Sequence, residues 1–199
     1  MVRDLSSWIV RYDAKVMGTT ATLTPEKANK KGSVWLAVPA GFSSFEVAFD
    51  LRIAGTPPDA DGLTLSWIVA GAGDPAPDSS GSTLNLPTRP GYAVAFDTFP
   101  APTVLLLDGS ATNLADNTNV LAKTLASAPL SVTHDWQPVV VRFELGKLTA
   151  AWSGGAPLSA QLAGATMSTT YLGFTAATGG ADSEHAVRAV RVAVAGSCL

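Results

Sequence analysis

Two carboxylate residues lie next to apolar segments, in positions where a side chain can contact a ligand. Asp61-Gly62 comes directly before one such segment, and Asp97 comes near the end of another. Loops at strand ends carry a large share of the binding residues in proteins. Carboxylate oxygens accept hydrogen bonds, and a nearby aromatic ring such as Phe99 stacks on apolar surfaces. This combination suits the hydroxyls and the apolar ring face of a sugar.

Two further segments are rich in small and polar residues of the same kind. The irregular connection 71–90 contains Ser80 and Gly81, and a later loop covers residues 178–183. A connection as long as the first is uncommon in a compact domain and is usually functional or mobile. Because Asp, Gly and Ser are also the ordinary residues of turns, the residue types alone leave open a sugar site and a set of plain turns.

The residues needed for the common hydrolytic mechanisms are missing or poorly spaced. There is no Gly-x-Ser-x-Gly motif, and we expect the two histidines, His134 and His185, to be loop or capping residues. Glu46 and Asp50 share one face of a predicted strand, about 13 Å apart by strand rise, which exceeds the ~5–10 Å of a glycosidase acid pair. We expect them to have cross-strand partners. The sequence favours a protein that is not an enzyme.

Composition excludes several partners. The chain of 199 residues is 47% hydrophobic and 15% charged, with a formal net charge of −3. Its local basic group, Lys27, Lys30 and Lys31, is predicted to be a solvated loop, so no nucleic-acid surface is expected. No apolar run reaches the ~20 residues of a membrane helix, so we expect no membrane insertion.

The residues at the two ends of the chain give information on the cellular compartment of the protein and on its disulfides. Residues 1–4 are not followed by the apolar region of a signal peptide, so we expect an intracellular chain or a mature or excised module at the cell surface or outside. The single cysteine, Cys198, excludes a disulfide within the chain, so packing alone must hold the fold.

Short alternating segments separated by Gly and Pro predict an all-β fold of two packed antiparallel sheets. We expect one domain over residues 1–199, because no linker or composition shift divides it. Strands are predicted at 7–10, 21–24, 33–38, 44–53, 63–69, 91–99, 103–107, 136–145, 148–152, 171–176 and 186–194, and 119–125 is ambiguous.

The segment 63–69 is the centre of the predicted arrangement. Its odd-numbered residues are apolar and should face the core, whereas Thr64 and Ser66 lie on the opposite, polar side, which only Ile68 interrupts. This pattern is typical of a sheet with one face on a core.

Three segments in order resemble the L-type (legume-type) lectins. They are Ala60-Asp61-Gly62-Leu63-Thr64-Leu65, Val94-Ala95-Phe96-Asp97-Thr98-Phe99, and Gly173-Phe174-Thr175-Ala176-Ala177-Thr178-Gly179 with Glu184-His185-Ala186-Val187 after it. The N-terminal half fits as well, so the resemblance covers nearly the whole chain. It implies the concanavalin A-like jelly roll, with a flat back sheet and a curved front sheet, and a carbohydrate-binding function.

The resemblance also assigns site residues. Asp61 matches the aspartate that binds sugar hydroxyls, usually after a cis peptide, so a cis Ala60–Asp61 bond is predicted. Gly81 or its neighbours match the glycine of the second loop, and Asp97 matches a metal-binding aspartate. The variable specificity loop corresponds to residues 179–182. The expected carbohydrate-binding set is therefore Asp61, Gly62, Ser80, Gly81, Asp97, Phe99, Gly179, Gly180 and Asp182.

The chain departs from the family at the metal site. Ala95 stands where plant members carry Glu, and Phe99-Pro100-Ala101-Pro102 follows Asp97 in place of Asn and Asp ligands. Calcium takes six or more oxygens, so its ligand set is incomplete here. We expect a lectin-like module that lacks the full two-metal site. A structural or adhesion domain without sugar binding and a glycan hydrolase on the same fold are the alternatives. The plant relatives associate through the back sheet, which allows a homo-oligomer.

Overall fold

A computed structural model describes residues 4–37, 44–55, 59–69, 83–108, 120–124, 134–162 and 171–194. Within these ranges the chain forms one short 3-10 helix and a series of β-strands. In chain order the elements are η1 (Leu5–Ser7), β1 (Ile9–Tyr12), β2 (Lys15–Met17), β3 (Thr20–Thr24), β4 (Lys31–Ala37), β5 (Phe45–Ala54), β6 (Gly62–Ile68), β7 (Gly91–Asp97), β8 (Thr103–Asp108), β9 (Val120–Lys123), β10 (Gln137–Glu144), β11 (Lys147–Trp152), β12 (Leu158–Gln161), β13 (Tyr171–Ala177) and β14 (Glu184–Val194).

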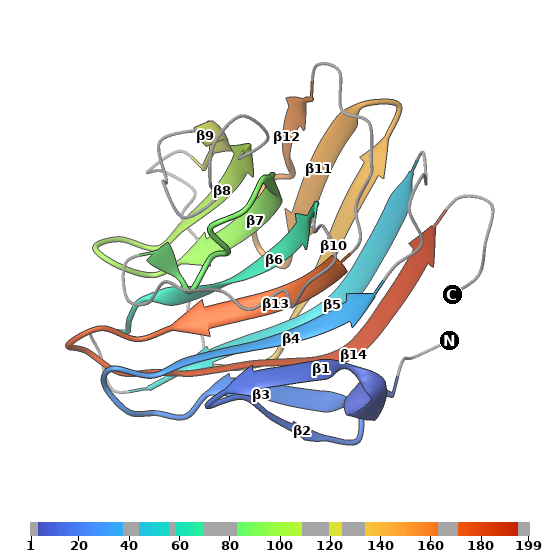
Figure 1. Cartoon of the computed structure of the whole chain (residues 1–199). Helices are drawn as coiled ribbons and strands as arrows, with labels where there is room; N and C mark the ends of the chain where they lie inside the picture. Colours follow the sequence, from blue (N-terminus) through green and yellow to red (C-terminus); the bar gives the residue numbers. More distant parts are fainter. Residues whose placement is uncertain are drawn as a thin grey trace.

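The strands form two seven-stranded sheets that stack on each other (Figure 1). The first sheet has the order β1-β4-β13-β6-β7-β8-β9, and the second has the order β12-β11-β10-β5-β14-β3-β2. Neighbouring strands are antiparallel in both sheets. The expectation of an all-β antiparallel sandwich is confirmed. No helix in the described ranges is long and apolar enough to cross a bilayer.

Alternating side chains of the two sheets build the core between them. β5 is buried at every second residue, from Phe45 to Ile53, as its sequence pattern predicts. Aromatic rings join the sheets: Phe49 lies 4.9 Å from Phe174, and Phe45 lies 5.0 Å from Trp67, both edge to face. Burial of each such side chain contributes roughly 1.5–3 kcal/mol before its entropy cost.

The prediction that the second side of β6 is an ordinary polar face is wrong. Thr64 and Ser66 are fully buried, because the turn after Thr83 covers this side of the first sheet. The Thr64 hydroxyl bonds those of Ser66 (2.8 Å) and Thr175 (2.7 Å), and Thr175 donates to the Leu84 carbonyl (2.8 Å). A small second apolar cluster lies around these hydroxyls: Trp35, Ile68, Leu84, Leu86, Ala93, Ala95 and Leu107. Ile68 therefore belongs to that cluster.

Two short edge strands, β2 and β12, were not predicted from the sequence, and β9 lies in the segment 119–125, which the sequence left ambiguous. β2 and β12 form the two edges of the second sheet, and β9 forms an edge of the first. Each has only three or four residues, which is too few to show a clear alternation. β7 ends at Asp97, so Phe99 lies beyond the strand.

The outer face of the second sheet carries paired charges, as expected for Glu46 and Asp50. Glu46 accepts a hydrogen bond from Arg142 at 2.6 Å, and Asp50 accepts one from Arg188 at 3.0 Å. Exposed pairs of this kind contribute little to stability. They show that these carboxylates are held by cross-strand partners.

Candidate functional site

The ends of β6, β7 and β13 meet at one rim of the first sheet (Figure 1). Gly62 at the start of β6 pairs with Asp97 on one side and with Ala177 on the other. This register places Asp61 between the residues that follow β7 and those that follow β13. Three segments far apart in sequence therefore converge at this rim.

The backbone around Asp61 is held from several directions. The Ala60–Asp61 peptide bond is cis, which confirms the prediction. The Asp61 amide donates to the Ala177 carbonyl at 3.1 Å. Its own carbonyl accepts from the amide of Thr98 at 2.8 Å and from the Thr98 hydroxyl at 3.0 Å. These bonds join Asp61 to the residues after both neighbouring strands.

The Asp61 carboxylate is buried and incompletely satisfied. Its residue is only 7% exposed, and Oδ2 has no hydrogen-bond partner among the described residues. Burial raises the pKa of this carboxyl above its ordinary value. A Cβ placed on Gly179 would lie 3.2 Å from Oδ2, so the glycine backbone comes close to the acid. Buried acceptors normally have partners, which makes Oδ2 a candidate ligand contact.

Asp97 and Phe99 lie on the neighbouring segment. Burial raises the pKa of Asp97 to about 6, and the nearby charge of Asp61 adds to the shift. The Phe99 amide donates to Asp97 Oδ1 at 3.1 Å and favours the charged form. The Phe99 residue itself is 51% exposed, and a cis bond joins it to Pro100. An exposed ring and two acids therefore share one rim.

Asp97→Asn is expected to stabilise the protein at neutral pH. Because the folded pKa lies above the unfolded one, ionisation of Asp97 costs stability as pH rises from about 4 to about 6, and the full cost is present above that range. Asparagine keeps the acceptor for the Phe99 amide. Solvent screening of this partly exposed group limits the expected gain to about 1 kcal/mol.

Urea unfolding in EDTA at pH 7.5 and at pH 4 measures this effect. The stability difference between Asp97→Asn and wild type should appear at pH 7.5 and disappear at pH 4. Asp108→Asn, at the other end of the β7–β8 pair, is the matched control. A loss of stability in Asp97→Asn at pH 7.5 would contradict the assignment.

The loop after β13 is bonded to a segment that the sequence analysis did not place at the site. Asn29 donates its amide to the Gly179 carbonyl at 2.9 Å. Thr178 accepts at Oγ1 from the Lys30 amide (2.8 Å) and donates to the Lys27 carbonyl (2.7 Å). The residues 27–30 were predicted to be a solvated loop, so their structural role was missed. No local signal identifies it, because the contact joins residues about 150 positions apart.

Other predicted residues have different positions. Gly180 is exposed, and a Cβ there would meet no neighbouring atom within 4 Å. Asp182 is half-buried, and its carbonyl accepts from the Ser183 hydroxyl at 2.7 Å. Ser80 and Gly81 lie outside the described residues. The structure therefore brings Asp61, Asp97, Phe99 and Gly179 to one rim.

Ser183, the last residue of the predicted loop 178–183, supports the segment before β6. Its hydroxyl accepts from the Ala60 amide at 3.3 Å and lies 3.2 Å from Asp59 Oδ1. Asp59 Oδ2 in turn lies 3.5 Å from His134 Nε2. His134 is half-exposed in a bend before β10, as predicted. These contacts connect the residues before β14 to the cis peptide.

Gly62 has a structural role that its sequence position did not reveal. Its φ is +145°, and a Cβ would overlap the Phe96 carbonyl and lie 2.9 Å from the Asp97 Cα. Gly62→Ala is therefore expected to cost about 2 kcal/mol or more in unfolding free energy. Thermal and urea unfolding measure it.

Gly154→Ala provides the matched control for Gly62→Ala. Gly154 also has a positive φ, +80°, but its Cβ position is open. Only the conformational cost remains there, about 1 kcal/mol. Equal losses in the two variants would show that close packing of β6 on β7 is not the cause.

Within the described residues, no three or more His, Cys, Asp or Glu side chains are grouped so that they could hold a metal ion. At the rim, Asp61 and Asp97 supply two carboxylates, and the Phe99 amide already donates to one of them. Calcium takes at least six oxygen ligands.

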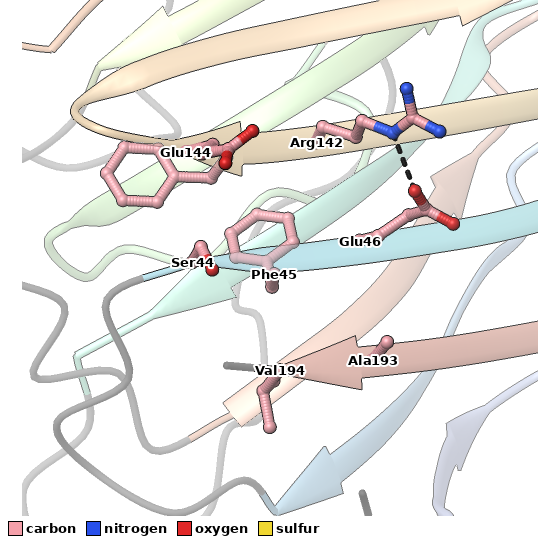
Figure 2. A pocket seen from close by; sticks show the side chains of 8 residues that line it. Ser44, Phe45, Glu46, Arg142, Glu144, Ala193 and Val194 are labelled. Atoms are coloured by element: carbon pink, nitrogen blue, oxygen red, sulfur yellow. Dashed lines mark hydrogen bonds and ion pairs between the residues drawn. The ribbon is translucent and has the colours of Figure 1, made fainter. Parts of the chain in front are cut away.

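A depression of about 300 Å³ lies on the second sheet, away from the rim (Figure 2). Glu46 on β5 and Glu144 on β10 both line it, and Arg142, two residues before Glu144, is the cross-strand partner of Glu46. The Arg142 guanidinium holds Glu46 at 2.6 Å. Glu46 is therefore engaged in the ion pair and is not a free acid partner for Glu144.

The fold and the rim together define the class of protein. Two stacked seven-stranded sheets with this rim form a concanavalin A-like lectin sandwich. A model of the legume-like lectin family matches residues 2–151, and the chain belongs to this family. A search of curated protein sequences found no match.

Three solved structures illustrate the similarity in fold. The exoplasmic/lumenal domain of VIP36, in its Ca2+/Man3GlcNAc-bound form, superposes with a TM-score of 0.74 at 20% identity, covering 94% of this chain and 83% of that chain. The carbohydrate recognition domain of Emp46p, in a potassium-bound form, gives 0.76 at 14% identity, with 96% and 94% covered. That of Emp47p gives 0.72 at 16%, with 96% and 92% covered. At these identities the likeness establishes the fold.

Proposed function

We propose that the rim formed by Asp61, Asp97, Phe99 and Gly179 binds a saccharide, and that residues 1–199 form one lectin-like domain without catalytic activity. The observation that carries the proposal is the buried Oδ2 of Asp61, which has no partner among the described residues and lies beside the Gly179 backbone. A carboxylate accepts hydrogen bonds only, so sugar hydroxyls are suitable donors.

Further features of the rim suit a sugar. The half-exposed Phe99 ring offers an apolar face for stacking next to the two acids. A side chain on Gly179 would crowd the Asp61 carboxylate, with its Cβ 3.2 Å from Oδ2, so glycine lets the loop backbone approach the acid. The VIP36 domain in the Man3GlcNAc-bound form makes mannose-type oligosaccharides the first ligands to test. We propose no binding of nucleic acid and no insertion into a membrane. The proposal is compatible with a homo-oligomer in which copies of the chain associate through the second sheet.

We propose that this binding does not depend on the full two-metal site. What supports this is that hydrogen bonds of the protein itself, to Ala177 and from Thr98, position the Asp61 backbone. A structural or adhesion domain that has lost sugar binding is the second candidate. The observation that favours it is the lack of a cation-ligand group among the described residues.

A glycan array followed by calorimetry, in calcium and in EDTA, tests both candidates. We expect binding in both buffers. Binding only in calcium would retain the saccharide site and reject metal independence. No binding in either buffer would reject the proposed function and leave the structural role. Hydrolysis of any bound oligosaccharide, followed by chromatography, would contradict the absence of catalysis.

A further inference from the structure

A second cavity, of about 380 Å³, lies beside the segment 27–30. Its wall includes Tyr12, Asp13, Lys15, Thr22, Lys27 and Lys30. The segment 27–30, which supplies two of these lysines, also bonds the Gly179 loop through the Asn29 amide and the Thr178 hydroxyl. The same segment therefore contacts both the cavity and the rim.

The cavity carries an excess of positive charge in a chain whose formal net charge is −3. Asp13 is already engaged: Oδ1 lies 3.1 Å from Lys30 Nζ, and Oδ2 accepts from the Lys31 amide at 3.2 Å. Within the described part of the chain, Lys15 and Lys27 form no ion pair. Glu26, an exposed neighbour of Lys27, is the other acid on this segment. The two lysines therefore leave about two positive charges unneutralised by contact.

The remaining polar groups of the wall can act as donors. Tyr12 is half-exposed at a backbone φ of +58°, and the Lys31 ammonium lies 4.6 Å from the centre of its ring. Tyr12 and Thr22 supply hydroxyls, and the lysines supply ammonium groups. Hydrogen bonds from charged donors to phosphate or sulfate are about twice as strong as neutral ones. The wall is therefore suited to an oxyanion.

We propose that this cavity binds a phosphate or sulfate monoester carried by a saccharide, so that the protein selects acidic over neutral glycans. The inference rests on the proposed function for its saccharide part. The cavity exceeds the size of an oxyanion alone, which leaves room for part of the attached sugar. Lys15 and Lys27 contact the anion. The hydrogen bonds from the segment 27–30 to the Gly179 loop connect the anion site to the rim.

The test compares a mannose 6-phosphate with mannose by calorimetry at low salt. The phosphorylated sugar should bind at least tenfold more tightly, and 0.5 M NaCl should reduce that advantage. The double variant Lys15→Gln/Lys27→Gln should remove the advantage and leave mannose affinity unchanged. Lys123→Gln/Lys147→Gln, on β9 and β11, removes the same charge elsewhere and should retain it.

Inorganic phosphate separates this inference from the proposed function. We expect phosphate to shift the NMR amide signals of residues 12–15 and 27–30 in wild type and in Asp61→Asn, but not in the double lysine variant. Those shifts without any mannose binding would reject the saccharide site and keep the anion site. Equal affinities for mannose and mannose 6-phosphate would overturn the anion site and leave the saccharide site. A higher affinity for mannose 6-phosphate that persists in the double lysine variant would also overturn the anion site.

Discussion

Asp61→Asn is expected to abolish saccharide binding while leaving the protein as stable as wild type or more stable at neutral pH. The carboxylate is buried, its pKa is raised by burial, and Oδ2 has no partner among the described residues. Ionised Asp61 therefore costs stability in the absence of a ligand. Asparagine has the same shape but loses the charge. Two charge-assisted hydrogen bonds to sugar hydroxyls contribute about 3 kcal/mol, or at least a hundredfold in affinity.

Calorimetry with the best array ligand and urea unfolding at pH 7.5 measure the two effects on the same preparations. Asp182→Asn is the matched control, because Asp182 is half-buried in the same loop region and should retain binding. A loss of binding together with a large loss of stability would show that Asp61 is a structural residue. Unchanged saccharide affinity in Asp61→Asn would show that the Asp61 carboxylate does not contribute to binding.

Saccharide affinity should also fall as the pH is lowered, because Asp61 becomes protonated. Protonated Asp61 loses acceptor capacity, and its raised pKa moves this loss to a higher pH than for an ordinary aspartate. The Asp61→Asn variant should lack this dependence wherever residual binding can be measured.

His185→Gln is expected to remove much of the acid sensitivity of the fold. His185 lies within β14 and is fully buried, so its interpretation as a loop or capping residue was wrong. The Thr24 Oγ1 lies 2.7 Å from His185 Nδ1, within hydrogen-bond distance, and 3.1 Å from the Ser183 carbonyl oxygen. Nε2 has no partner among the described residues. Burial lowers the pKa of His185 to about 3, so the folded protein holds this ring neutral.

The sign of the effect follows from this lowered pKa. The unfolded chain binds a proton below pH 6.5, whereas the folded chain does so only near pH 3, so stability falls as pH decreases between these values. The full loss is roughly 3–5 kcal/mol. Asp97 opposes it by about 1 kcal/mol between pH 6 and pH 4. His185 therefore has the larger effect on the pH dependence of stability in this pH range.

Urea unfolding between pH 7.5 and pH 5 measures the slope, before most exposed carboxylates titrate. His185→Gln should be less stable than wild type at pH 7.5, because it disturbs the bond to Thr24, but should lose less stability on acidification. His134→Gln, at the half-exposed histidine, should keep the wild-type slope. An unchanged slope in His185→Gln would assign the acid sensitivity to other groups.

The sequence by itself determined the local features of this protein. Alternation in 44–53 and 136–145 predicted β5 and β10, because side chains of a strand point to opposite faces. The strands predicted at 63–69 and 91–99 likewise placed Asp61 before β6 and Asp97 near the end of β7. The cis bond at Ala60–Asp61 came from the family resemblance and not from any pattern in the residues.

Only the tertiary structure decided what covers each strand and which loops meet. Thr64 and Ser66 look solvent-facing in the sequence, yet the turn at Leu84 buries them. His185 is neutral because β3 and β5 enclose it, and the segment 27–30 reaches the rim through Thr178. Periodicity reports the two faces of a strand. It cannot report which distant segment packs on each face, because that depends on contacts between residues that are not neighbours in the sequence.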